Sequence, residues 1–93
     1  MNISQAVALR VAELLRKNNM TQYRLEKEIG LPHETLKSIM KEKTKGVNLK
    51  TIIALAYGFN MTVSEFLDCD YFKYENLNID WFNVFLINEY FSF

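Results

Sequence analysis

The sequence contains few of the residues that form disulfides and tight turns, and it has no apolar run long enough for a membrane span. Its 93 residues include one Cys, one Pro and three Gly. A single Cys cannot form a disulfide within the chain, and no Gly-rich phosphate loop is present. No apolar run approaches the roughly 20 residues that a membrane-spanning helix needs. We therefore expect one small domain without disulfides or a membrane span.

Groups for catalysis or metal binding are also scarce. His33 is the only His and has no Cys or His partner at metal-ligand spacing. Cys69 lies between Asp68 and Asp70, which disfavour its reactive thiolate form. No nucleophile–His–acid arrangement emerges, and a chain this short buries too small a core for an internal catalytic cleft. We expect no enzymatic activity, no metal and no cofactor.

The N-terminal segment does not follow the signal-peptide pattern. Arg10, Glu13 and Arg16 interrupt its apolar residues. Together with the single Cys, this favours the reducing cytoplasm as the location.

The net charge of zero conceals an asymmetry along the chain. Residues 1–50 hold ten Lys/Arg and five Asp/Glu, a balance of +5, whereas residues 51–93 hold one Lys and six Asp/Glu, a balance of −5. Nine of the thirteen Phe, Trp and Tyr residues follow residue 70. A basic surface can face a polyanion. The pattern predicts a domain over residues 1–69 and an aromatic C-terminal extension over residues 70–93.

Periodic apolar residues and capping signals predict five helices. Asn18-Asn19, Gly30 and Asn60 are expected to end helices, because Asn and Gly tolerate the left-handed conformation. The helices are expected over residues 3–18, from the Thr21 cap to Gly30, from a first turn at Pro32, over Leu49–Phe59 after the Asn48 cap, and after the Thr62-Val63-Ser64-Glu65 capping box.

The second and third helices, joined by a tight turn at Gly30, match the helix-turn-helix pattern. In the third helix, one side carries apolar residues and the other carries polar ones. The apolar side holds Pro32, Leu36, Ile39 and Met40, and the polar side holds His33, Glu34, Lys37, Ser38 and Lys41.

Over roughly residues 5–68 the chain resembles the Cro and phage-repressor (XRE) family of DNA-binding domains. The resemblance depends on Thr21-Gln22, Leu25, Ile29, Gly30, Leu36, Ile39, the Lys43-Thr44-Lys45 loop and the closing segment 60–67. It implies an all-α, five-helix domain that binds double-stranded DNA by sequence and regulates transcription, most simply as a repressor. The chain departs from the family at Glu26, where a small residue is usual.

The resemblance also implies the roles of individual residues. Base contacts fall to His33, Glu34, Lys37, Ser38 and Lys41, and phosphate contacts fall to Thr21, Gln22, Lys43, Thr44 and Lys45. Two alternatives stay open. Lys37 and Lys41 could form only a solvated face, and Glu34 could serve only the dipole at the start of its helix.

The aromatic end of the chain has to pack against something, because so apolar a segment is poorly solvated. Trp81, Phe82, Phe85 and Leu86 are candidates for a homodimer interface. Alternatively, the segment completes the monomer core or derives from read-through or cloning. The runner-up function, from a different class, is a protein-interaction module such as an antitoxin or an antirepressor-like partner binder.

Overall fold

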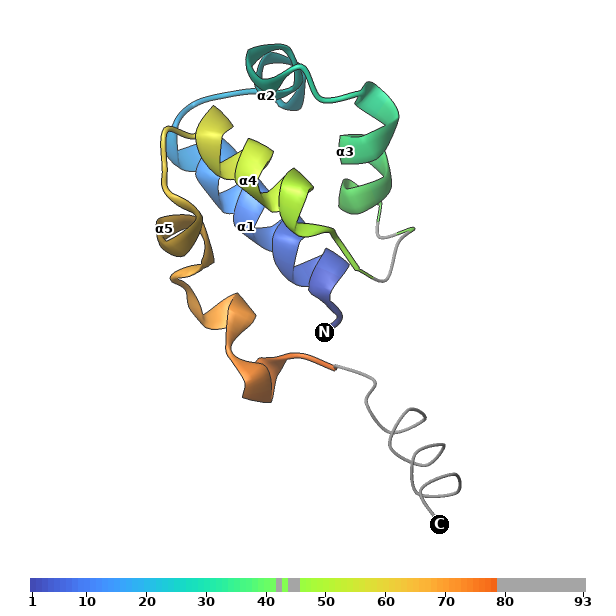
Figure 1. Ribbon diagram of the computed structural model, residues 1–93, viewed down its shortest axis with the longest axis vertical. Helices are drawn as coiled ribbons and strands as arrows, with labels where there is room; N and C mark the ends of the chain where they lie inside the picture. Colours follow the sequence, from blue (N-terminus) through green and yellow to red (C-terminus); the bar gives the residue numbers. More distant parts are fainter. Residues whose placement is uncertain (42, 44–45, 79–93) are drawn as a thin grey trace.

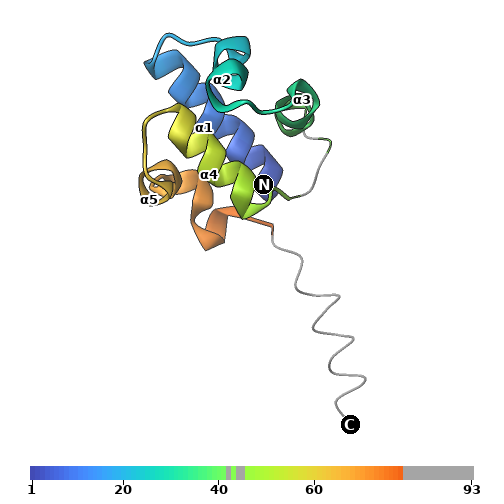
Figure 2. The same ribbon diagram turned by 45° about the horizontal axis from the view of Figure 1, so that its top comes forward.

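The computed structural model describes residues 1–41, 43 and 46–78, and within this part all regular structure is helical (Figures 1 and 2). The elements are α1 (Ile3–Lys17), α2 (Gln22–Ile29), α3 (His33–Met40), α4 (Leu49–Gly58), α5 (Val63–Leu67) and the short 3-10 helices η1 (Asp70–Phe72) and η2 (Tyr74–Asn76). The all-α class and the five α-helices are therefore confirmed. No helix in these residues has the length and apolar character to cross a membrane.

Each of the predicted capping residues begins a helix. Thr21 accepts a hydrogen bond from the backbone N–H of Arg24 at 3.1 Å, and Asn48 accepts one from that of Thr51 at 2.8 Å. Thr62 and Glu65 form the expected reciprocal capping box. The hydrogen bonds that the Glu65 carboxylate receives from the backbone N–H and the hydroxyl of Thr62 lower the pKa of Glu65 below its usual value.

The predicted helix ends are also close to those observed. Asn19, Gly30 and Asn60 have φ angles of 50°, 64° and 57°, in the left-handed region. The first and fourth helices end at Lys17 and Gly58, each one residue earlier than expected. Pro32 was placed wrongly. It is the exposed N-cap of α3 and not part of its first turn or its apolar side. Its ψ angle of 137° is extended and not helical, so the helix begins only at the next residue.

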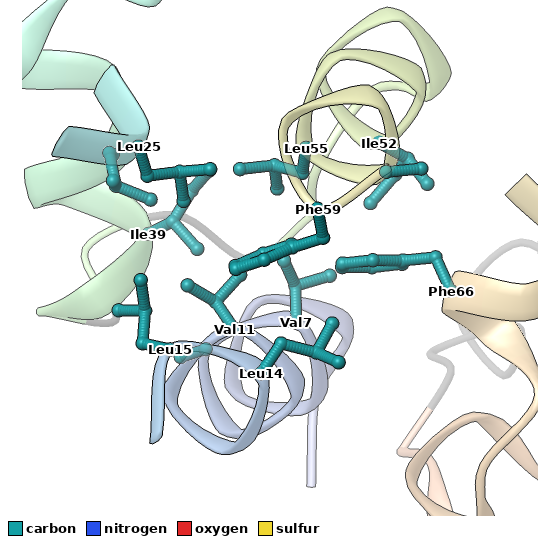
Figure 3. Close-up of a cluster of buried hydrophobic side chains, with 13 residues drawn as sticks. Val7, Val11, Leu14, Leu15, Leu25, Ile39, Ile52, Leu55, Phe59 and Phe66 are labelled. Atoms are coloured by element: carbon teal, nitrogen blue, oxygen red, sulfur yellow. The ribbon is translucent and has the colours of Figure 1, made fainter. Parts of the chain in front are cut away.

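The core lies where α1 and α4 face each other, with α3 and α5 closing it from two sides (Figure 3). Val7 and Val11 of α1 face Leu55 of α4, and Phe59, just after α4, points into the same space. Ile39 enters from α3. This cluster fixes the directions of the surrounding helices, since α3 contacts α1 and α5 contacts α4.

A buried arginine attaches α5 to α1. Arg10 is only 6% exposed, and its Nε and Nη2 donate to the backbone oxygens of Phe66 (2.7 Å) and Glu65 (2.9 Å). Its Nη1 pairs with Glu13. A helix of five residues is not stable alone, so these bonds to its last turn hold it in place. From the sequence, Arg10 was expected only to interrupt the apolar residues of the N-terminal segment.

The helix-turn-helix unit is held to the rest of the domain at Gly58. A Cβ atom at this position would lie 2.6 Å from Leu25 Cδ1 and 2.7 Å from Ile29 Cγ2, both on α2. Leu25 is completely buried and therefore has little room to move away. Glycine at the end of α4 thus permits the close contact between α2 and α4.

We predict that Gly58→Ala destabilises the protein. Alanine gains about 1 kcal/mol of helix propensity over glycine, but overpacking a core contact costs about 1–3 kcal/mol, so we expect a net loss. Urea denaturation followed by far-UV circular dichroism measures the change. Gly46→Ala is the matched control, because a Cβ there meets no atom within 4 Å. Equal effects at the two positions would contradict the role of Gly58.

Candidate nucleic-acid interface

The side chains of α3 divide into an inner and an outer set. Leu36 and Ile39 are 0% and 3% exposed and pack in the core. On the other side, the side chains of Glu34 and Lys37 are 78% and 39% exposed. Their carboxylate and ammonium groups lie 4.0 Å apart, which is a weak surface pair. The outer side of α3 is therefore available to a partner along its length.

All five proposed base-contacting residues lie on this outer part of α3 or directly after it. His33, Glu34 and Lys41 are exposed, and Lys37 and Ser38 are half-buried. The structure thus brings these five residues together on one surface.

A hollow separates α3 from the start of α4. It is lined by Glu34, Thr35, Ser38, Ile39, Gly46, Val47, Asn48 and Thr51. Thr35, Asn48 and Thr51 also line a second hollow, which extends to the helix-turn-helix turn and includes Lys50. Lys50 is exposed in the first turn of α4. Lys50 was not among the residues expected to contact DNA, because its place beside the helix-turn-helix turn follows from the packing of α4 and not from a local sequence pattern.

The proposed phosphate-contacting residues occupy two places. Thr21 and Gln22 are exposed at the N-terminus of α2, where backbone N–H groups favour an anion. Lys43 is exposed in the α3–α4 connection. Thr44 and Lys45 lie outside the described residues, as do the candidate interface residues Trp81, Phe82, Phe85 and Leu86.

Glu26 and His33 connect α2 to the first residue of α3. The Nδ1 atom of His33 lies 3.0 Å and 3.1 Å from the two carboxylate oxygens of Glu26. The Glu26 side chain is 10% exposed and that of His33 is 66% exposed. Glu26, which departs from the family pattern, is therefore compatible with close packing of α2 and α3 because its carboxylate is bonded to His33.

Charge is distributed unevenly over the structure. The described residues from 21 to 50 hold six Lys/Arg and three Glu, a balance of +3, and residues 51–78 hold one Lys and four Asp/Glu, a balance of −3. The first group forms α2, α3 and the start of α4, and the second includes α5, η1 and η2 on the opposite side (Figure 1). The surface around α3 is thus the one suited to a polyanion.

Comparison with known protein families agrees with this geometry. A family model described as a Cro/C1-type HTH DNA-binding domain matches residues 10–70, which are 61 of the 93 residues. The match includes all of α2, the turn and α3. Comparisons with curated proteins and with solved structures found no match.

We predict that His33→Ala destabilises the domain through Glu26. The substitution leaves a carboxylate that is nearly buried without its partner, which costs about 1–3 kcal/mol. A double-mutant cycle with Glu26→Ala, measured by urea denaturation, should give a coupling energy within the usual range of about 0.5–3 kcal/mol for contacting residues.

The same cycle on the exposed Glu34–Lys37 pair is the control. Because surface pairs contribute about 0–1 kcal/mol, we expect a smaller coupling energy there. A Glu26–His33 coupling no larger than that of the control would contradict a structural role for this pair.

Proposed function

Because the chain belongs to the Cro/C1-type family of helix-turn-helix DNA-binding domains, we propose that it binds double-stranded DNA in a sequence-specific manner. In this proposal it regulates transcription, most simply as a repressor that occludes a promoter. The observation that carries this proposal is the outer side of α3, with its exposed Glu34 and Lys41 and half-buried Lys37. The major groove of DNA is about 12 Å wide and admits one α-helix.

We assign base contacts to His33, Glu34, Lys37, Ser38 and Lys41. Lys donates to the guanine acceptors O6 and N7, Ser is compatible with several base edges, and Glu accepts from cytosine N4. The bond between His33 Nδ1 and Glu26 orients the imidazole and leaves Nε2 as the nitrogen that can meet DNA.

We assign phosphate contacts to Thr21 and Gln22 at the start of α2 and to Lys43, Thr44 and Lys45 between α3 and α4. Lys50 joins this group, because it is exposed and lines the same hollow as the helix-turn-helix turn. In the sequence, Thr21 and Gln22 precede α3 and the others follow it, and contacts from both groups would set the position of α3 in the groove.

We further propose that the protein acts in the cytoplasm as a homodimer, has no enzymatic activity and needs no cofactor. A single helix-turn-helix contacts only a few base pairs, and two copies contact two half-sites about one helical turn apart. The aromatic extension after residue 70 supplies the dimer contact in this proposal. Selection of binding sites from random duplex DNA tests the function, and a selected pair of inverted half-sites is the expected result.

We predict that Lys43→Ala weakens binding to all sequences alike. Each phosphate contact releases condensed counterions, so the slope of log K against log salt should become shallower by about one. Fluorescence anisotropy of labelled DNA over a series of salt concentrations measures this slope. The control is Lys73→Ala, since Lys73 lies in the acidic part and pairs with Asp70 at 3.0 Å. An altered sequence preference with an unchanged slope would contradict the phosphate role.

We predict that Glu34→Gln relaxes the preference at one base pair by about 1–3 kcal/mol. Binding to non-specific DNA should stay equal or become tighter, because the substitution removes a negative charge near phosphates. Competition with single-base operator variants measures the preference, and Glu28→Gln on the exposed side of α2 is the control. An unchanged preference profile would limit Glu34 to the helix dipole.

A further inference from the structure

The outward side of α4 carries three exposed apolar side chains that no other described part of the chain covers. Leu49, Ile53 and Tyr57 are 62%, 49% and 75% exposed. They are spaced four residues apart and therefore lie along one side of the helix. We call these three residues the α4 stripe.

The composition of α4 is that of a helix covered on both sides. Its inner side holds the buried Ile52, Leu55 and Ala56, and its one charged residue is Lys50. A helix that is apolar all round is usually buried, whereas a surface helix carries charged residues on its outer side. The α4 stripe therefore has the exposure and composition that are typical of docking surfaces for apolar partners.

Residues 79–93 have the composition of that partner. Ten of these fifteen residues are apolar, two are acidic and none is Lys or Arg. A segment without basic residues is unsuited to DNA. The apolar composition of residues 79–93 instead suits contact with a short apolar surface.

The described part of the chain ends beside the start of α4. The Asn78 N–H donates to the Met1 carbonyl at 2.7 Å, and the N-terminal amino group donates to the Asn76 carbonyl at 3.1 Å, which fixes this end near the start of α1. In Figures 1 and 2, α1 and α4 both begin on this side of the molecule. The stripe is about 12 Å long at 1.5 Å per residue, and a fifteen-residue segment can extend to about 50 Å. Residues 79–93 are therefore long enough to cover the stripe.

We propose that residues 79–93 of a second copy pack on the α4 stripe, and that two copies exchange these segments around a two-fold axis near the start of α4. The proposal rests on the proposed function, because contact with two half-sites requires two associated copies. A reciprocal exchange also makes the interface closed, so that association stops at the dimer.

The experiment uses Trp81, which is the only Trp of the chain and lies within residues 79–93. The full-length protein is examined without DNA by sedimentation velocity and by the emission maximum of Trp81 over a dilution series. We expect a dimer with blue-shifted emission that shifts to the red as dilution separates the copies.

Ile53→Asp should weaken self-association by about tenfold or more, because docking would bury an unpaired charge. Its Trp81 emission should be red-shifted at concentrations where the unmodified protein is a dimer. Leu9→Asp is the matched control, since Leu9 is 44% exposed on α1, and it should leave both measurements unchanged. Far-UV circular dichroism verifies folding, and Tyr57→Ser provides a milder variant should Ile53→Asp unfold.

Three results would overturn the proposal. One is a dimer that persists after removal of residues 81–93. Another is association unaffected by substitutions in the α4 stripe. The third is a monomer with blue-shifted emission that does not change on dilution, because this places the segment on its own chain. DNA is absent from these measurements, so they test self-association independently of DNA binding. Self-association through the α4 stripe can be disproved while Lys43-dependent DNA binding persists, and DNA binding can be disproved while self-association persists.

Discussion

The close contact between α2 and α4 at Gly58 is the constraint on which the position of the exposed α3 surface depends. Leu25 and Ile29 occupy the space that a side chain at position 58 would need. Because position 58 is glycine, α2 can pack this closely against α4. The position of α2 then sets the turn at Gly30 and the start of α3, whose Leu36 and Ile39 enter the same core. Because α3 has only eight residues, its direction follows from this packing and not from helix propensity.

Two buried charged residues complete this arrangement, and each acts on an element too short to be stable alone. Arg10 bonds to backbone oxygens in the last turn of α5, and Glu26 bonds to the first residue of α3. Removing a charge from water is unfavourable unless hydrogen bonds replace the lost hydration. Among the described residues, no buried side-chain nitrogen or oxygen is without a hydrogen-bond partner. These bonds favour one placement of each helix, because only that placement satisfies the buried charge.

The helices were predictable because residues close in the sequence determine where each helix begins and ends. A cap such as Thr62 acts on residues within one turn, and Asn19 or Asn60 ends a helix through its own φ angle. Contacts between distant residues leave no such pattern. The partner of Arg10 is 56 residues away, and the need for glycine at position 58 is apparent only once α2 lies on it. The outer side of α3 was predictable from its period, whereas the neighbouring Lys50 required the packing of α4.

Under the proposed function, the α3 surface is small compared with an operator that has two half-sites. In the assignment proposed above, at most five side chains of one α3 contact bases, and each good base contact discriminates by about 1–3 kcal/mol. Some of these groups, such as His33 and Glu34, also have structural or electrostatic roles that limit their contribution. Specific DNA binding exceeds non-specific binding by about 4–10 kcal/mol, and in the proposed dimer this discrimination is shared between two half-sites. In the proposed dimer, the exposed side chains of Leu49, Ile53 and Tyr57 supply the contact, and this apolar side of α4 begins directly next to the basic surface at Lys50.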